Sequence, residues 1–293
     1  MKILIIGSGS IGIYLGVFLH KNGHEVKLLG REKLKKIHKT ILIEDEIFTT
    51  PDKIYSFPSD EKYDFIFITS KLYDLENNLE KIKENNLISK NIVSIQNGLL
   101  DDSIYDKYVD KNTFASISIF EGFRLIENQL KVSKSNMGWK VDDNMVGVRV
   151  SDLLQKIGIN CTTEKDIDSI RAEKLIINSS VNILSAIEEK TLFELYNEND
   201  TKNIIDNLFD ESYEVLSREF KIKEKGLLRM EFYNLIKDMK HYSSTYQDAI
   251  THKKTEINFL NNLVIKLAEK NNIDISVNKK IVSEFYKKYK NFN

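Results

Sequence analysis

The chain has 293 residues and a formal net charge of −1, with 41% hydrophobic and 30% charged residues. This composition indicates a packed protein long enough for two domains, and it argues against nucleic-acid or membrane partners. The single cysteine, Cys161, excludes an internal disulfide and cannot form a structural zinc site alone, so we expect a cytoplasmic protein with no metal.

The first 30 residues predict a strand, a tight turn, a helix and a second strand. An apolar strand is expected at 2–6, a helix at 11–22 and another strand at 24–29. A lysine followed by an apolar run also occurs in signal peptides, but glycines and serines interrupt this run too often for a membrane span. The βαβ interpretation is therefore favoured.

The turn has the spacing G-x-G-x-x-G at Gly7, Gly9 and Gly12. Gly7 allows the sharp turn, Gly9 leaves room for a pyrophosphate, and Gly12 lets the helix pack closely on the strand. Free N–H groups at the helix start then face the phosphates. The cofactor-binding residues expected in this turn are Gly7, Ser8, Gly9, Ser10, Ile11 and Gly12.

The end of the second strand distinguishes the two dinucleotides, because NAD sites usually carry an acid there and NADP sites an arginine. Arg31 occupies this position and can pair with a 2′-phosphate, whereas the next residue, Glu32, is an acid and would favour NAD. The lysines at 33, 35 and 36 can support the phosphate or form a solvated helix face. NADP is favoured over NAD.

The alternation of strand and helix continues, with strands expected at 63–69 and 91–96 and a helix at 75–84. Ligands of an open parallel sheet bind outside the carboxyl ends of its strands. Lys71 and Asn97 follow two such ends, so Lys71 is expected to reach the cofactor and Asn97 the nicotinamide ribose or the substrate. An ordinary Asn-Gly turn is the alternative for Asn97.

Three short alternating segments between 113 and 147 predict strands that extend the sheet in antiparallel fashion. A helix at 151–157 and a last strand at 160–163 follow, and Asp166 or Asp168 can cap the next helix. The expected fold is α/β, with a Rossmann-type dinucleotide-binding domain at 1–165 and an all-α substrate and catalytic domain at 166–293.

Lys174, Asn178 and Asn182 are four residues apart in an otherwise mostly apolar stretch. On a helix they share one face, so an ammonium and two carboxamides point the same way. Buried polar groups need partners, and these can be other protein groups or a ligand. Both possibilities remain open at this level.

A second polar stretch contains Ser243, Ser244 and Thr245, and Glu256 follows it. The hydroxyls suit a helix N-cap or the binding of a small carboxylate. Ser244 and Glu256 can share a ligand only if the helix between them is broken. Thr255 can cap a new helix with Glu256 in its first turn, and an exposed first-turn acid is then the alternative to a ligand-binding role for Glu256.

Together these motifs resemble the ketopantoate reductase (2-dehydropantoate 2-reductase) family over essentially the whole chain. The resemblance rests on GSGSIG at 7–12, Arg31, Lys71, QNG at 96–98, K-x-x-x-N-x-x-x-N at 174–182, SSxxQD at 243–248 and TEI at 255–257. It implies NADPH-dependent reduction of a 2-oxo acid to a 2-hydroxy acid, toward pantothenate and coenzyme A.

The resemblance also implies residue roles. Lys174 is the expected proton donor, and Glu256 is expected at the junction of cofactor and substrate as a catalytic residue. The expected substrate contacts are Asn97, Asn178, Asn182 and Ser244. Burial would improve the lysine as an acid by lowering its pKa. A monomer or homodimer is expected.

The chain departs from the family pattern at a few places. Asn258 and Asn262 stand where aspartate and glycine are usual, and Ser276 stands where proline is common. The bulky stretch 190–193 follows the helix that carries Lys174 and puts the substrate's identity in doubt. The alternatives are an enzyme of the same class that acts on another branched 2-oxo acid, an imine or a sugar phosphate, and a catalytically silent NADPH sensor.

Overall fold

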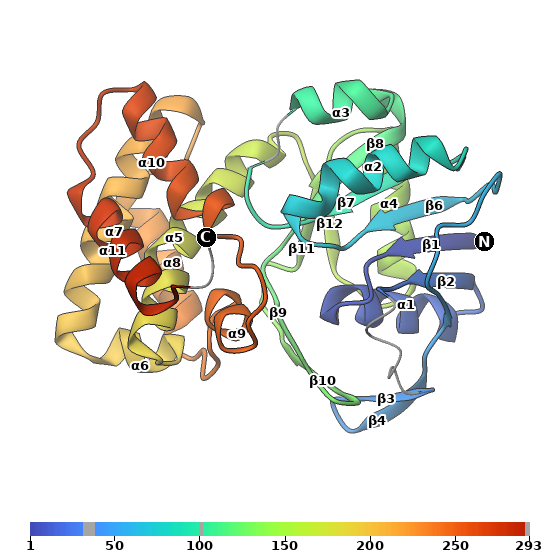
Figure 1. Cartoon of the computed structure of the whole chain (residues 1–293), viewed down its shortest axis with the longest axis horizontal. Helices are drawn as coiled ribbons and strands as arrows, with labels where there is room; N and C mark the ends of the chain where they lie inside the picture. Colours follow the sequence, from blue (N-terminus) through green and yellow to red (C-terminus); the bar gives the residue numbers. More distant parts are fainter. Residues whose placement is uncertain (32–38, 100–101, 291–293) are drawn as a thin grey trace. The chain divides into compact units, whose positions relative to one another are not determined.

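The computed structural model describes residues 1–31, 39–99 and 102–290, so Glu32 and the lysines at 33, 35 and 36 lie outside the described residues (Figure 1). The chain divides into two compact units, Met1–Ile167 and Asp168–Asn293. The first combines sheets and helices and the second consists of helices, in agreement with the expected fold class.

An eight-stranded sheet forms the centre of the first unit. Its order is β12 (Cys161–Glu164), β11 (Trp139–Asp142), β8 (Phe114–Ile119), β7 (Ile92–Ile95), β6 (Phe65–Ile68), β1 (Lys2–Ile6), β2 (Glu25–Leu29) and β5 (Asp52–Ile54). The chain passes from β1 to β2 and β5 on one side and then returns to β6 on the other. Such a reversal of strand order is where open parallel sheets bind their ligands.

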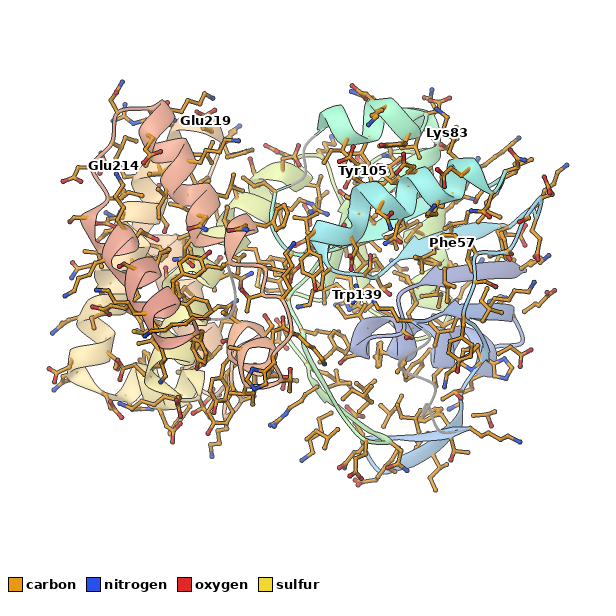
Figure 2. All side chains as sticks on the ribbon, in the orientation of Figure 1. Phe57, Lys83, Tyr105, Trp139, Glu214 and Glu219 are labelled. Atoms are coloured by element: carbon orange, nitrogen blue, oxygen red, sulfur yellow. The ribbon has the colours of Figure 1, made fainter. Side chains whose placement is uncertain are left out.

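Alternating residues of β1 serve the two faces of this sheet. Ile3 and Ile5 join a buried cluster with α1 (Ser10–Lys21) and α4 (Met145–Lys156), whereas Leu4 and Ile6 are fully or nearly fully buried outside that cluster. Helices α2 (Leu75–Glu84) and α3 (Asp102–Tyr108) also flank the sheet in Figure 1. Trp139, labelled in Figure 2, is fully buried, and its Nε1 donates a hydrogen bond to Glu121 at 2.8 Å.

The region 113–147 differs from the antiparallel extension that the sequence predicts. β8 runs parallel to β7 and is buried along nearly its whole length, while β11 alone pairs antiparallel with β8. The segment Gln129–Ser133 does not join the main sheet. It is β10 of a second sheet, in the order β4 (Glu46–Thr49), β3 (Thr40–Ile43), β10 and β9 (Gly122–Ile126).

The second sheet accounts for the segment Gln129–Ser133, because β9 and β10 form a hairpin and pair with each other. Only two residues, Glu127 and Asn128, separate the two strands, and Glu127 adopts a positive φ of 52°. Such a short loop requires antiparallel neighbours. The helix expected at 151–157 also begins earlier, at Met145, since the Asn144 side chain accepts a hydrogen bond from Gly147 N.

The second unit begins with the long helix α5. Its helices are α5 (Ile167–Glu188), α6 (Leu192–Asn197), α7 (Asn199–Glu219), α8 (Lys225–Ile236), α9 (Ser244–Ile250), α10 (Asn261–Lys270) and α11 (Ser276–Lys288). The stacked rings of Phe209 and Phe232, with centroids 5.6 Å apart, join α7 to α8. Among the described residues, no helix combines the length and apolar character needed to span a bilayer.

Candidate active site

The glycine turn after β1 has the geometry of a phosphate-binding turn. Gly7 has a φ of +122°, and a Cβ there would lie 2.7 Å from Thr69 Oγ1. A Cβ on Gly12 would lie 1.9 Å from the carbonyl oxygen of Gly7, so neither position accepts a side chain. A Cβ on Gly9, in contrast, would have no atom within 4 Å. Open space therefore lies beside the N-terminus of α1, where a pyrophosphate can approach the backbone.

Ser8 provides a second sign that this turn holds a ligand. The residue is 7% exposed, and its Oγ has no hydrogen-bond partner within the described part of the chain. A Cβ on Gly30 would lie only 2.6 Å from this oxygen, so the end of β2 closely approaches the turn. Buried hydroxyls are rarely left without partners. The open space and the unsatisfied hydroxyl both fit a bound dinucleotide.

The carboxyl ends of β6 and β7 lie along the same edge of the sheet. Ile6 pairs with Ile68, and Ile68 with Ser94, so the residues that follow these strands are neighbours. The Gln96 side chain donates to the carbonyl oxygen of Lys71 at 3.2 Å and thereby joins the two ends. Asn97 follows directly in a turn. The structure thus brings Lys71 and Asn97 to the edge that carries the glycine turn.

Two residues missed by sequence reasoning support this edge. Gln96 lies in the QNG motif at 96–98, but we predicted no structural role for its side chain, which holds the turn after β6. Thr69 Oγ1 donates to the Gly7 carbonyl oxygen at 2.9 Å and fixes the same turn from the other side. A polar residue at the end of an apolar strand was the available signal.

Arg31 follows β2 at this edge, and its side chain is 71% exposed. The guanidinium forms an ion pair with Asp74, with Nη2 2.5 Å from Oδ2. Asp74 is the last residue of the short 3-10 helix η2 (Leu72–Asp74), which follows Lys71. This partner could not be predicted from the sequence, because the two residues are 43 positions apart.

Helix α5 places Lys174, Asn178 and Asn182 on one face. From Arg171 to Ala186 every residue is buried except Lys174 and Asn178, which are partly exposed. Asn182 is 7% exposed. The polar stripe is therefore open at its first two positions and closed at its third, and a ligand can reach the ammonium.

The surroundings of Lys174 favour loss of its proton near neutrality. Burial and, to a smaller extent, the positive charge of Arg171 lower its pKa, Glu256 acts in the opposite direction, and the net result is a fall from the ordinary 10.5 to about 7. Arg171 is 2% exposed and lies one turn before Lys174 on α5. A group with a pKa near 7 can give and regain a proton at physiological pH.

Glu256 differs from the exposed acid that its sequence position alone suggests. It is 6% exposed and stands at the N-cap of the 3-10 helix η4 (Ile257–Phe259), without a side-chain capping bond. Helix α9 ends at Ile250, so Ser244 and Glu256 lie on different elements. The break required for both to serve one ligand is present.

The start of α9 is tied to the stripe-bearing helix. Ser243, the N-cap, accepts a hydrogen bond from Tyr246 N at 3.1 Å and donates to the Asn182 carbonyl oxygen at 2.8 Å. Its backbone N–H donates to Ser185 Oγ at 3.2 Å. The expected cap is confirmed at Ser243, and the neighbouring Ser244 is exposed.

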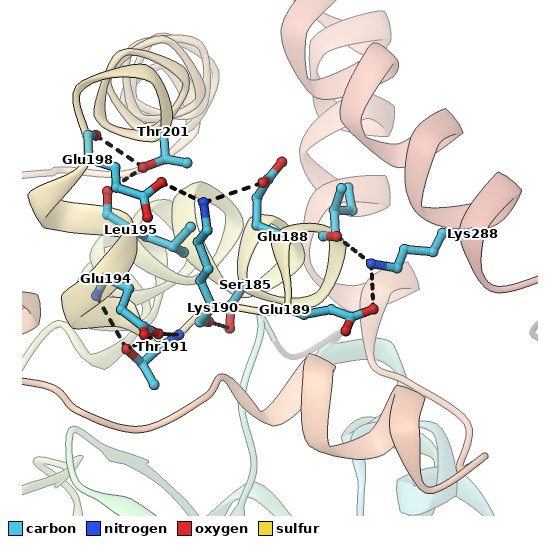
Figure 3. Close-up of polar contacts among 11 residues, drawn as sticks. Ser185, Glu188, Glu189, Lys190, Thr191, Glu194, Leu195, Glu198, Thr201 and Lys288 are labelled. Atoms are coloured by element: carbon cyan, nitrogen blue, oxygen red, sulfur yellow. Dashed lines mark hydrogen bonds and ion pairs between the residues drawn. The ribbon is translucent and has the colours of Figure 1, made fainter.

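The stretch 190–193 lies beside the same turn of α5. Figure 3 shows the Ser185 hydroxyl donating to the Lys190 carbonyl oxygen, at 2.7 Å, and Thr191 forming a capping box with Glu194. Phe193 N donates to the Met239 carbonyl oxygen at 2.9 Å. Because the Ser185 hydroxyl also accepts a hydrogen bond from Ser243 N, the same side chain contacts both the bulky stretch and the start of α9.

Two family models match most of the chain. The model described as "Ketopantoate reductase PanE/ApbA" matches residues 3–138, and "Ketopantoate reductase PanE/ApbA C terminal" matches residues 166–288. The 2-dehydropantoate 2-reductase of Aquifex aeolicus is 26% identical over 300 residues, covering 95% of this chain and 94% of the relative. The enzyme of the same name from Archaeoglobus fulgidus is 24% identical and covers 96% of each.

Solved structures share the fold at lower identity. A D-mandelate dehydrogenase bound to NADH and anilino(oxo)acetate is 21% identical over the whole of both chains, with a TM-score of 0.86. A PanE/ApbA family ketopantoate reductase from Ralstonia eutropha JMP134 is 20% identical, covering 99% of this chain and 100% of that one, with a TM-score of 0.84.

Proposed function

The chain belongs to the ketopantoate reductase family, and on that premise we propose that it reduces 2-dehydropantoate to (R)-pantoate with NADPH. The observation that carries the proposal is Lys174, a partly exposed ammonium on a largely buried helix, with a pKa lowered to about 7. The proposed setting is pantothenate and coenzyme A synthesis in the cytoplasm. The oxidoreductase class follows from the family itself.

Unit 1 residues supply the proposed cofactor site. The backbone of the turn at 7–12 and the N-terminus of α1 bind the pyrophosphate. The buried hydroxyl of Ser8 donates a hydrogen bond to the same pyrophosphate. Arg31 binds the 2′-phosphate. Lys71 and Asn97, at the neighbouring strand ends, bind the phosphate and nicotinamide-ribose parts of the cofactor.

The proposed chemistry divides between cofactor and side chains. When bound, NADPH supplies a hydride to C2 of the 2-oxo acid. Lys174 stabilises the negative charge that develops on the carbonyl oxygen and then delivers its Nζ proton to that oxygen. Asn178 and Asn182 orient the lysine and the substrate without adding charge, and Asn97 and Ser244 complete the proposed substrate contacts.

Glu256 has an electrostatic role in this proposal. Its carboxylate raises the pKa of Lys174, against the effects of burial and of Arg171. It therefore keeps a fraction of the lysine protonated before each turnover. The same carboxylate can accept a hydrogen bond from a ribose or substrate hydroxyl, so we assign it both to catalysis and to cofactor binding.

A second candidate keeps the reaction and changes the substrate to another branched 2-oxo acid. The observation in its favour is the stretch 190–193, which departs from the family pattern and is held by Ser185 beside the start of α9. A change there alters the surroundings of Ser244 and leaves Lys174 untouched. A silent NADPH-binding sensor is disfavoured, since it would not need a partly exposed lysine with a lowered pKa.

The test is a steady-state screen of NADPH oxidation with ketopantoate, 2-oxoisovalerate and 2-oxoisocaproate. The proposal predicts the highest kcat/KM for ketopantoate and (R)-pantoate as the product. A higher value for either of the other acids would transfer the proposal to the second candidate. Absence of turnover with all three acids, in protein that binds NADPH, would refute both.

A further inference from the structure

Asp74 forms an ion pair with the Arg31 guanidinium, the group that would bind a 2′-phosphate. Arg31 Nη2 lies 2.5 Å from Asp74 Oδ2, and Asp74 is the more sheltered partner, with 28% of its side chain exposed against 71% for Arg31. A carboxylate and a phosphate compete for the same face of a guanidinium, because both accept its forked N–H donors.

Asp74 is held in position by the turn that follows β6. Its backbone N–H donates to the Lys71 carbonyl oxygen at 2.9 Å, and it directly precedes α2. Its carboxylate caps no N–H group of that helix. The side chain thus lies at the edge shared by the ends of β1, β2 and β6, where it pairs with Arg31.

We propose that Asp74 determines cofactor selectivity by competing with the 2′-phosphate for Arg31, so that the chain uses NADH as well as NADPH. The proposal rests on the proposed function, because it assumes a nicotinamide dinucleotide in this site. NADPH must displace Asp74 from Arg31 and place its phosphate near a carboxylate, and both steps oppose its binding. NADH carries a neutral 2′-hydroxyl and leaves the ion pair in place.

The experiment measures the Kd of NADPH and NADH for the whole protein and for Asp74→Asn. The variant should bind NADPH about three- to tenfold more tightly, because competition at an exposed ion pair is worth roughly 1 kcal/mol, while NADH should change less than about twofold. Asp74→Ser is a second variant that removes the charge and keeps a helix-capping residue. Thermal unfolding establishes that both variants fold.

Glu76→Gln is the matched control. Glu76 lies two residues further on, in the first turn of α2, and pairs with Lys107 at 3.1 Å instead of Arg31. Both substitutions remove one negative charge from the same region. A general electrostatic effect would appear in both, whereas competition for Arg31 appears in the Asp74 variants alone.

The outcomes separate this inference from the proposed function. A tighter Kd for NADPH and for 2′,5′-ADP in Asp74→Asn supports competition, even if no 2-oxo acid is reduced. Unchanged affinity for both cofactors, an equal change for both, or the same change in Glu76→Gln would overturn it, even if ketopantoate is the substrate. 2′,5′-ADP isolates the phosphate site because it lacks the nicotinamide.

Discussion

Replacing Lys174 with methionine should stabilise the protein near neutral pH. Methionine keeps a similar length and removes a charge that is costly to bury. The folded pKa of about 7 lies below the ordinary 10.5, so between these values the unfolded chain binds more protons than the folded one. The wild-type free energy of unfolding therefore rises with pH across that window, and the lysine's cost is greatest below it.

The size of the effect follows from the shift in pKa. A shift from 10.5 to about 7 sets a ceiling of roughly 4–5 kcal/mol, because each pH unit is worth about 1.4 kcal/mol. Lys174 is partly exposed and lost packing offsets some of the gain, so we expect about 1–3 kcal/mol at pH 7.

The assay is urea unfolding followed by circular dichroism at 222 nm, for wild type and Lys174→Met at pH 6.5 and 9.5. The stabilisation should be largest at pH 6.5 and shrink by more than half at pH 9.5. Lys266→Met is the control, since Lys266 is an exposed residue of α10 in the same unit. Equal stability of wild type and Lys174→Met at both pH values would refute the assigned pKa.

Three further predictions concern the cofactor and the proton donor. Gly9→Ala should leave the melting temperature unchanged and weaken NADPH binding about tenfold or more, because its Cβ meets no atom of the protein but enters the space proposed for the pyrophosphate. Gly12→Ala should instead lower the melting temperature, because its Cβ meets the Gly7 carbonyl oxygen. Unchanged NADPH affinity in Gly9→Ala would contradict the turn's role. Arg31→Ala should raise the Kd of NADPH far more than that of NADH, measured by fluorescence titration, and equal losses would reject the 2′-phosphate assignment. In the direction of reduction, kcat should fall as pH rises through the pKa of Lys174. Glu256→Gln should move this fall in kcat to lower pH and Arg171→Met should move it to higher pH. Shifts of both variants in the same direction would contradict the electrostatic roles of these residues.

The sequence predicted those parts of the fold that depend on local constraints. Glycine spacing at 7–12 indicated the tight turn after β1, because side chains on Gly7 and Gly12 would collide with nearby atoms, whereas Gly9 leaves open space. The helix at 75–84 was predicted with its observed bounds, since its apolar positions recur with helical period. The polar stripe of α5 followed from the same periodicity.

Strand partners and directions could not be predicted equally well. β8 was expected to be antiparallel but runs parallel to β7, and β10 joins a separate sheet with β3, β4 and β9. Alternation of apolar and polar residues indicates a strand but not its neighbour. The sheet containing β3 and β4 was missed because those strands are short and β10, the second partner of β3, is distant in sequence, with Gln129 opposite Leu42.

Features of the site that arise from tertiary packing were also hidden. An exposed first-turn acid was one expectation for Glu256, but the structure shows the residue only 6% exposed. Asp74 could not be assigned to Arg31, because ion pairs between residues distant in sequence leave no local pattern. Burial was expected to lower the pKa of Lys174, but the opposing effects of Arg171 and Glu256 required the structure.

The most direct test of the proposed reaction is the kcat of Lys174→Ala with saturating NADPH and ketopantoate. The variant should turn over about 10²–10⁴ times more slowly than wild type, corresponding to roughly 3–5 kcal/mol, because it lacks the proton donor. The Kd of NADPH should change less than about twofold, which shows that the cofactor site is intact. Wild-type turnover in Lys174→Ala would contradict the role of this lysine as the proton donor.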